Sequence, residues 1–258
     1  MSFIHAIFLG FVEGLTEFLP ISSTAHLIFA SRLLHIPQTD FQKFFEVFIQ
    51  AGAILAVIII YFKYVLANKR LITKVIVSFF PTAVVGFVLY KIIKNIFFEA
   101  TYLMGWAFFI IGLGFLLVEY LVKNKKIRLV QSIKRLNYKT VIIIGLIQSL
   151  AVIPGVSRAG VVLLAMMVMG YRRDESALYS FLLAVPTILA AAAYDLYKSR
   201  NLLAASSTNI ALLAIGFLVS FISAYFVVRW FIRYLQNKTL INFGIYRIGL
   251  AIILMLSP

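Results

Sequence analysis

The stretch GFVEGLTEFLPISSTAHL, residues 10–27, decides the fold class, because it places charges inside an apolar segment and then breaks that segment. Apolar residues run from Phe3 onward, and Glu13 and Glu17 interrupt them on one helix face. Pro20 removes a backbone donor and clashes with the preceding turn, so we expect a helix to end there. Inside a membrane, the backbone exposed at such a break must be buried in protein or line a cavity.

The composition excludes a soluble protein. Of the 258 residues, 63% are hydrophobic and 13% are charged, whereas a soluble domain is about half apolar and about a quarter charged. Disordered chains are poor in apolar residues, so disorder is excluded as well. The chain has no cysteine, which excludes a disulfide framework, a thiolate metal site and a cysteine nucleophile. We therefore expect an all-α polytopic membrane protein that forms a single integral membrane domain over residues 1–258.

Six apolar stretches are predicted to span the membrane fully, at about 44–62, 73–93, 100–122, 176–198, 209–234 and 240–258. Two further stretches are interrupted. The first covers about 2–31, and the second covers about 140–170 and is broken near Pro154. Each interrupted stretch is either one kinked span or a re-entrant helix hairpin.

The distribution of positive charge favours two re-entrant hairpins. In that topology one side of the membrane carries sixteen Lys and Arg residues and the other side carries six. The positive-inside rule makes the richer side cytoplasmic, with 123–139 as a basic connector and both termini outside. The net charge of +15 is then explained by anionic lipid headgroups rather than by nucleic acid.

A shift of 135 positions relates the two halves of the chain. It places Glu13 on Gln148, Ser22 on Ser157 and Ser23 on Arg158. Each half then consists of a hairpin followed by three spans, so the second half enters from the opposite face. We predict an inverted-topology repeat, 1–122 and 140–258, whose broken tips meet near the midplane.

Glu13 and Glu17 are the first candidate functional residues. A like-charged pair four residues apart is unfavourable, and each charge in the membrane costs roughly 2.5–3.5 kcal/mol. A cation, a proton or an arginine would offset that cost, and the alternative is a protonated pair inside a polar bundle. We expect the pair to be functional and to be able to hold a divalent cation, Mg²⁺ or Ca²⁺.

Three hydroxyls and a histidine follow Pro20 within one and a half turns: Ser22, Ser23, Thr24 and His26. The hydroxyls suit the N-cap of a second half-helix. A hydroxyl three residues before an imidazole also fits a nucleophile with a nearby base. The residues alone leave both interpretations open.

The second break, QSLAVIPGVSRAGVV at 148–162, predicts a phosphate site. Gly155 allows a ligand to approach the backbone closely. Ser157 and Arg158 begin the following half-helix, whose N-terminus attracts anions, and the arginine fork pairs with phosphate oxygens. The alternative is that Arg158 neutralises the glutamates of the first segment.

Three more polar residues fall within apolar segments. Glu46 either supports the site acids or lies near the outer interface. Gln148, which takes the place of Glu13 in the second half, is a candidate supporting residue. Arg247 is expected to be an internal salt-bridge partner.

The sequence resembles the undecaprenyl-diphosphate phosphatases of the BacA type along nearly its whole length. EGLTEFLPISSTAHL at 13–27 is similar to the first signature of that family, and PGVSRAG at 154–160 is similar to the second. The family usually continues the second signature as S-R-S-G-x-T, and here Ala159 and Val162 replace two hydroxyl residues. This departure affects the expected efficiency more than the reaction type.

The resemblance implies a bacterial plasma-membrane enzyme that hydrolyses undecaprenyl diphosphate to the monophosphate and inorganic phosphate at the outer leaflet. It carries functional roles onto Glu13, Glu17, Ser23, His26 and Arg158. The residues nearby, Ser22, Thr24 and Ser157, are candidate phosphate-binding residues together with Gly155 and Arg158. Ser23 is the candidate nucleophile with His26 as base or leaving-group acid, and direct attack by His26 or by water stays open. A polyprenyl-phosphate flippase and a non-catalytic lipid-binding relative are the alternative functions, and a homodimer is one assembly state left open.

Overall fold

The computed structural model describes residues 1–96, 101–200 and 207–256. Within these ranges the chain is helical apart from turns, loops and one isolated β-bridge. The long helices are α3 (Asp40–Ala67), α4 (Lys69–Ile96), α5 (Thr101–Lys123), α8 (Arg173–Lys198) and α10 (Ser207–Asn237). The shorter helices are α1 (Phe3–Thr16), α2 (Ser23–Leu33), α6 (Tyr138–Gln148), α7 (Arg158–Val168) and α11 (Ile241–Leu256), with the 3₁₀ turns η2 (Ile133–Arg135) and η3 (Ser149–Val152). The all-α prediction is confirmed.

The length and composition of the helices match a multi-pass membrane protein. Among the described residues, α3, α4, α5, α8 and α10 are long and apolar enough to cross a membrane. The predicted sixth span is shorter, because α11 has 16 residues and extends only about 24 Å at 1.5 Å per residue. Residues 257–258 of that prediction lie outside the described ranges.

The two predicted breaks are present in the helices. α1 ends at Thr16, and after a turn through Pro20 the chain becomes helical again as α2. α6 ends at Gln148, and the chain passes through η3 and a loop containing Pro154 before α7 begins. Each interrupted segment therefore consists of two short helices joined by a non-helical tip.

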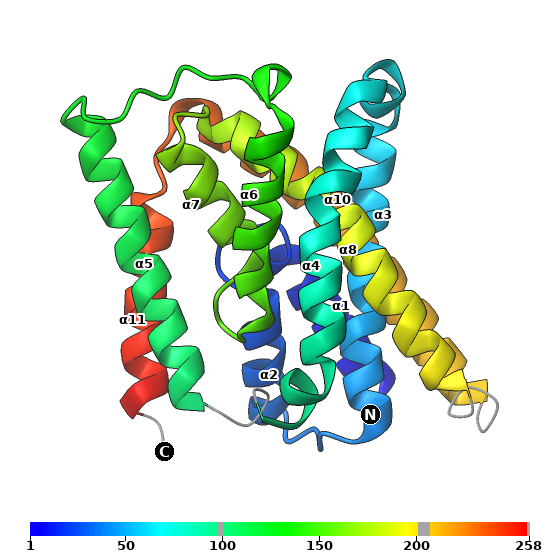
Figure 1. Ribbon diagram of the computed structural model, residues 1–258. Helices are drawn as coiled ribbons and strands as arrows, with labels where there is room; N and C mark the ends of the chain where they lie inside the picture. Colours follow the sequence, from blue (N-terminus) through cyan, green and yellow to red (C-terminus); the bar gives the residue numbers. More distant parts are fainter. Residues whose placement is uncertain (97–100, 201–206, 257–258) are drawn as a thin grey trace.

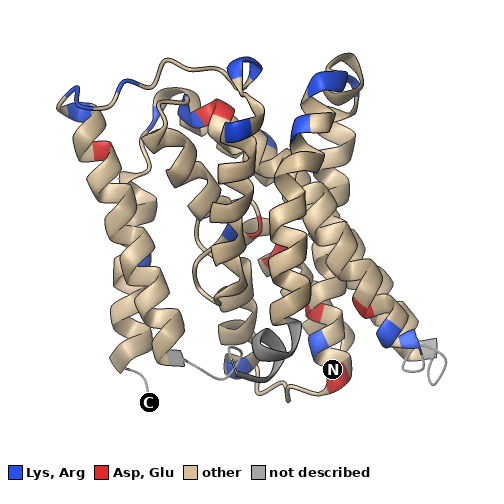
Figure 2. Cartoon of the chain, viewed as in Figure 1, with Lys and Arg blue, Asp and Glu red and all other residues tan. Residues whose placement is uncertain are grey.

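Figure 1 shows how the two broken segments are arranged. α1 and α2 extend from their tip toward the end of the molecule where α1 begins and α11 ends, and α6 and α7 extend toward the opposite end. Figure 2 shows that Lys and Arg are concentrated at the end to which α6 and α7 extend. The two tips are thereby placed in the interior of the bundle.

Close helix contacts hold the broken segments in place. α1 packs on α10, α6 packs on α4, and α3 contacts both α8 and α10. A Cβ atom on Gly10 would lie 2.6 Å from the carbonyl oxygen of Gly216, and one on Gly145 would lie 2.0 Å from that of Ser78. Only glycine permits this approach of two backbones, a common device in membrane helix packing.

Candidate functional site

A cavity of about 920 Å³ lies where the two broken segments meet. Its polar wall comes from both tips and comprises Glu17, Ser22, Ser23, Thr24, Gln148, Gly155, Ser157 and Arg158. Its apolar wall comes mainly from α4 and α8 and includes Phe79, Ala83, Gly86, Phe87, Ile188, Ala190 and Ala191. The cavity thus combines a polar end with an apolar side, as a ligand with a charged head and a hydrocarbon tail requires.

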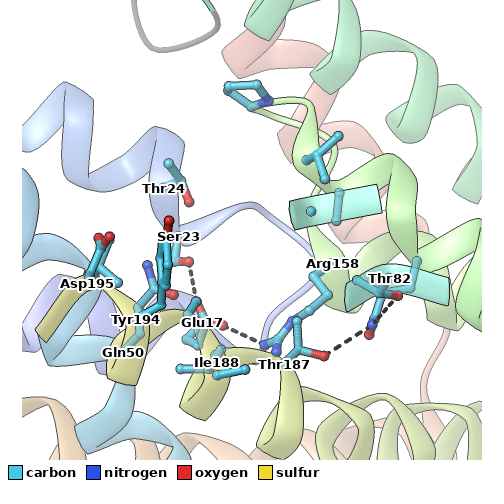
Figure 3. Close-up of a pocket in the computed structure, with 18 of the residues that line it drawn as sticks. Glu17, Ser23, Thr24, Gln50, Thr82, Arg158, Thr187, Ile188, Tyr194 and Asp195 are labelled. Atoms are coloured by element: carbon cyan, nitrogen blue, oxygen red, sulfur yellow. Dashed lines mark hydrogen bonds and ion pairs between the residues drawn. The ribbon is translucent and has the colours of Figure 1, made fainter. Parts of the chain in front are cut away.

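Glu17 joins the two tips. One carboxylate oxygen, Oε2, accepts a hydrogen bond from Ser23 Oγ, and the other, Oε1, accepts one from Arg158 Nη2 at 2.6 Å. Figure 3 shows Glu17 between these two side chains. Glu17 is only 8% exposed, so the acid, the hydroxyl and the guanidinium interact with little solvent between them. The sequence prediction placed these three residues in one site, and the structure brings them into contact.

Arg158 retains a donor for a ligand. Its Nη2 is bonded to Glu17, and its Nη1 has no hydrogen-bond partner within the described part of the chain. Arginine donors arranged as a planar fork suit phosphate oxygens. Arg158 therefore does what both sequence interpretations expected: it pairs with an acid and presents a free N–H group.

α2 and α7 both begin at the cavity wall. Their N-cap residues, Ser22 and Ser157, have the same positive φ of 68°, which is uncommon for residues other than glycine. Ser157 Oγ caps α7 by accepting a hydrogen bond from Gly160 N at 3.1 Å, whereas Ser22 makes no side-chain cap bond. Two helix N-termini, whose positive dipole ends attract anions, therefore meet at one cavity.

Glu13 lies behind this wall and not on it. Its side chain is fully buried, and neither carboxylate oxygen has a hydrogen-bond partner among the described residues. A buried carboxylate without a partner is costly as an anion. Glu13 is therefore placed where a proton, a cation or an ordered water would be needed.

Glu46 belongs to a separate polar cluster between α2 and α3. Its Oε1 accepts hydrogen bonds from Ser31 Oγ at 3.0 Å, Gln42 Nε2 at 2.9 Å and Gln38 Nε2 at 3.2 Å. It is buried and does not line the cavity. The structure thus gives Glu46 a position that links two helices.

The structure does not bring His26 to Ser23. His26 Nδ1 lies 2.7 Å from the carbonyl oxygen of Ser22, and Nε2 lies 2.6 Å from the hydroxyl of Tyr246. The imidazole stacks on Tyr246 with ring centroids 5.8 Å apart, and His26 is not among the cavity-lining residues. Both ring nitrogens are thus engaged outside the cavity, and the residue in contact with the Ser23 hydroxyl is Glu17.

Two threonines that the sequence analysis did not single out support Gln148. The Gln148 amide nitrogen lies 2.9 Å from Thr82 Oγ1 and 3.2 Å from Thr187 Oγ1. Each threonine follows a proline inside a long helix, Pro81 in α4 and Pro186 in α8. The repeated Pro-Thr pair is the sequence signal that would have identified them.

The cavity extends toward the end of the molecule that carries the termini. Asp40 and Lys43 lie at the start of α3, Asp195 and Lys198 lie at the end of α8, and all four line the cavity. These helix ends lie on the side opposite the Lys- and Arg-rich end (Figure 2). Charged side chains therefore surround the part of the cavity nearest that surface.

The prediction for Arg247 was wrong. Within the described ranges its guanidinium pairs with no carboxylate and instead donates to backbone carbonyl oxygens. Glu17, the acid of the site, is bonded to Arg158 and Ser23 and not to Arg247. An apolar span with a single arginine does not reveal whether a carboxylate or a carbonyl will satisfy that arginine.

Comparison with known proteins gives a consistent result. A family model described as "Bacitracin resistance protein BacA" matches residues 6–253. The chain is 45% identical over 253 residues to a protein of Sulfurihydrogenibium sp. named undecaprenyl-diphosphatase, covering 98% of both chains. It is 43% identical over 255 residues to the protein of that name from Wolinella succinogenes, covering 99% of this chain and 98% of the relative. With the one from Aquifex aeolicus the identity is 43% over 249 residues, covering 96% of each chain.

Proposed function

The chain belongs to the bacitracin resistance protein BacA family, and from this we propose that it dephosphorylates undecaprenyl diphosphate. Hydrolysis of the terminal phosphate yields undecaprenyl phosphate and inorganic phosphate, which recycles the lipid carrier used in cell-wall synthesis. The observation that carries this function is the contact of Glu17 with both Ser23 and Arg158 at the cavity wall. That contact brings together three groups: a carboxylate that can accept a proton, a hydroxyl, and a guanidinium that can bind phosphate.

In the proposed reaction, Ser23 Oγ attacks the terminal phosphorus and Glu17 accepts the hydroxyl proton, since these two groups are already hydrogen-bonded. The P–O bond to the lipid phosphate breaks, and undecaprenyl phosphate leaves. Water then attacks the phosphoserine phosphorus and the P–Oγ bond breaks. Glu17 returns its stored proton to Ser23 Oγ and takes the proton of the water, so inorganic phosphate is released and the extra proton passes to solvent. Direct attack by water, with Glu17 as base, is the second route, and attack by His26 is the third.

Charge stabilisation comes from both tips. Arg158 and the N-termini of α2 and α7 are placed to interact with the phosphate oxygens as negative charge develops on them. Binding of the diphosphate brings a second acceptor for Arg158 beside Glu17, and the unpartnered Nη1 is the donor available to it. The two hydroxyl residues that Ala159 and Val162 replace contribute nothing here.

A divalent cation, Mg²⁺ or Ca²⁺, is part of the proposal. Within the described ranges no three His, Cys, Asp or Glu residues form a metal-binding group, so an all-protein cage is not the form expected. Two carboxylates, Glu13 and Glu17, fit an ion that binds through one or two carboxylates and substrate phosphates, and among the described residues neither Glu13 oxygen has a hydrogen-bond partner. Such an ion would neutralise charge on the diphosphate.

The isoprenoid tail is proposed to lie along the apolar wall of the cavity. Phe79, Ala83, Gly86 and Phe87 form one stripe of α4, at positions i, i+4, i+7 and i+8. Ala190 and Ala191 of α8 line the same cavity. A Cβ added to Gly86 would have no atom of the described residues within 4 Å.

We further propose two inverted repeats, each with a re-entrant hairpin, and six spans that include α11. Addition of 135 to the bounds of α2, 23–33, gives 158–168, which are the bounds of α7. The helix contacts show the same relation between the halves. The first helix of the first hairpin, α1, packs on α10 of the second half, and the first helix of the second hairpin, α6, packs on α4 of the first half. The basic end is then cytoplasmic, and the cavity opens to the periplasmic side between the start of α3 and the end of α8. Whether the protein is a homodimer stays a prediction.

The deciding experiment is phosphate release from undecaprenyl diphosphate by the purified protein in detergent, with and without Mg²⁺ or Ca²⁺. We expect release that Arg158→Ala abolishes. A protein that releases no phosphate but moves undecaprenyl phosphate across vesicle membranes would be the flippase alternative. A protein that binds the lipid without either activity would be the lipid-binding relative.

A further inference from the structure

Arg247 in α11 is a buried cation that pairs with no carboxylate in the part of the chain that the structure describes. Its side chain is 0% exposed, and it does not line the cavity. A buried guanidinium is costly unless its N–H groups are satisfied, and the cost is higher within a membrane. The five N–H donors of an arginine diverge in a plane, so they can connect several acceptors at once.

Those acceptors belong to three different elements. Nη1 donates to the carbonyl oxygen of Pro20 at 2.9 Å, and Nη2 donates to that of Gly155 at 2.6 Å. Longer contacts of 3.3–3.4 Å reach further carbonyl oxygens, those of Ala107, Phe108 and Val156. The guanidinium also lies 4.5 Å from the centroid of the Phe108 ring, which adds a cation–π contact.

The two shortest contacts fall on the two tips. Pro20 lies three residues after Glu17 and three residues before Ser23, and Gly155 lies three residues before Arg158. One side chain from a third part of the chain therefore fixes the backbone on both sides of the Glu17–Arg158 pair. The preceding residue of α11, Tyr246, holds the first tip as well, through the His26 ring that also contacts the Ser22 carbonyl.

We propose that Arg247 is a positioning residue that sets the distance and orientation between the two tips, and so aligns Ser23 and Glu17 with Arg158. This inference rests on the proposed function for its catalytic consequence, but the positioning itself is a structural property. A misplacement of about 1 Å between reacting groups can lower the rate roughly 100-fold. Hydrogen bonds from Arg247 to both tips can therefore control turnover although Arg247 does not contact the substrate.

The test uses the cysteine-free background of the chain. Leu15, near the end of α1, and Leu150, in η3, are exposed apolar residues outside the cavity, so Leu15→Cys and Leu150→Cys provide two unique sites for spin labels. The inter-label distance distribution of the full-length protein is measured by pulsed EPR, and kcat and KM are measured with undecaprenyl diphosphate. The variants are Arg247→Gln and Arg247→Lys. The control is Arg173→Lys, which alters another partly buried arginine, paired with Glu119.

We expect Arg247→Gln to broaden the distance distribution and to lower kcat by about 100-fold while KM changes by less than about threefold. Arg247→Lys keeps the charge but has fewer donors, so it should recover part of both properties. Arg173→Lys should leave the distribution unchanged. If Arg247→Gln does not fold, Phe108→Leu, which keeps the guanidinium and removes the ring beneath it, should show a smaller broadening.

An unchanged distribution in the Arg247 variants, or in Phe108→Leu where they do not fold, would overturn the proposal whether or not turnover falls. A broadened distribution with full turnover would also overturn it, since the tips would then move without consequence. If the unmutated protein releases no phosphate, the proposed function fails, and the EPR measurement still decides whether Arg247 positions the tips.

Discussion

At the residue scale, Glu17 and Glu13 differ although only one helical turn separates them. Glu17 lines the cavity and is bonded to Ser23 and Arg158, whereas Glu13 is fully buried without a hydrogen-bond partner among the described residues. We expect Glu17→Gln and Glu13→Gln each to lower turnover tenfold or more, which corresponds to roughly 1.4 kcal/mol or more. Only Glu17→Gln removes the acid that contacts Ser23, so its loss should be the larger.

The measurement is kcat as a function of divalent-ion concentration. Glu175→Gln is the control, because Glu175 binds Ser132 and the backbone of Ile133 away from the cavity. A glutamine variant with full activity and an unchanged ion dependence would exclude that residue as a cation ligand.

Substitutions of Ser23 and of Arg158 should separate effects on the chemical step from effects on substrate binding. Ser23→Ala removes the hydroxyl proposed to attack phosphorus, so kcat should collapse while affinity for undecaprenyl diphosphate stays nearly intact. Arg158→Ala removes a permanent charge that acts in the ground state and in the transition state, so affinity and kcat should both fall. Arg158→Lys should recover only part, because lysine lacks the paired donors. Binding assays and steady-state kinetics on the three variants check this.

The same assay tests the position of His26, whose ring is held by Ser22 and Tyr246. If His26→Ala is inactive while Ser23→Ala keeps most of its kcat, the histidine becomes the better nucleophile. In that case the contact with Tyr246 must break for the ring to reach the cavity.

At the element scale, a substitution in the cavity-lining stripe of α4 can test where the lipid tail lies. Gly86→Leu places a branched side chain in the wall of the cavity, at a position where no atom of the described residues lies within 4 Å of a new Cβ. We expect it to lower kcat/KM for undecaprenyl diphosphate at least about tenfold, because the added side chain takes space needed by the tail. A short diphosphate such as farnesyl diphosphate should be affected much less.

Gly249→Leu is the matched control. Gly249 also has no atom within 4 Å of a new Cβ, but it lies on α11 outside the cavity. Equal losses on the long and the short substrate, or no loss on either, would place the tail elsewhere.

The sequence predicted most of the elements, for reasons that differ between them. Pro20 and Pro154 marked the two breaks because proline excludes a helical hydrogen bond, and the breaks were found at both positions. Hydropathy gave no indication that α1 packs on α10 and α6 on α4, because such pairing depends on where Gly10 and Gly145 meet a neighbouring backbone.

The candidate site was predicted in part. Glu17, Ser23 and Arg158 were identified because ionisable and hydroxyl residues are rare in apolar segments, and they are in contact. The direction of His26 could not be predicted, because it depends on Tyr246, 220 positions away in sequence. The acceptors of Arg247 are backbone atoms, which have no sequence signature.

At the scale of the whole molecule, the arrangement of charge relates the fold to the membrane. Lys and Arg are concentrated at the end to which α6 and α7 extend, while the termini and the charged surroundings of the cavity lie at the other end (Figure 2). The proposed activity at the outer leaflet requires the cavity to open on the side with fewer positive charges. The exchange of helix contacts between the two halves supports the proposed inverted repeat, in which one hairpin enters from each side.

This orientation predicts which positions are accessible from outside the cell. Lys125, in the basic connector 123–139, should be cytoplasmic, and Ser2, beside the start of α1, should be outside. The chain has no cysteine, so Lys125→Cys and Ser2→Cys each give one unique site for a membrane-impermeant thiol reagent. In intact cells, with the outer membrane permeabilised where one is present, Ser2→Cys should be labelled and Lys125→Cys should not. Both should be labelled after the plasma membrane is opened, which controls for thiols that are simply unreactive. Labelling of Lys125→Cys from outside would reverse the orientation and turn the cavity toward the cytoplasm, where it could not act on lipid diphosphate in the outer leaflet.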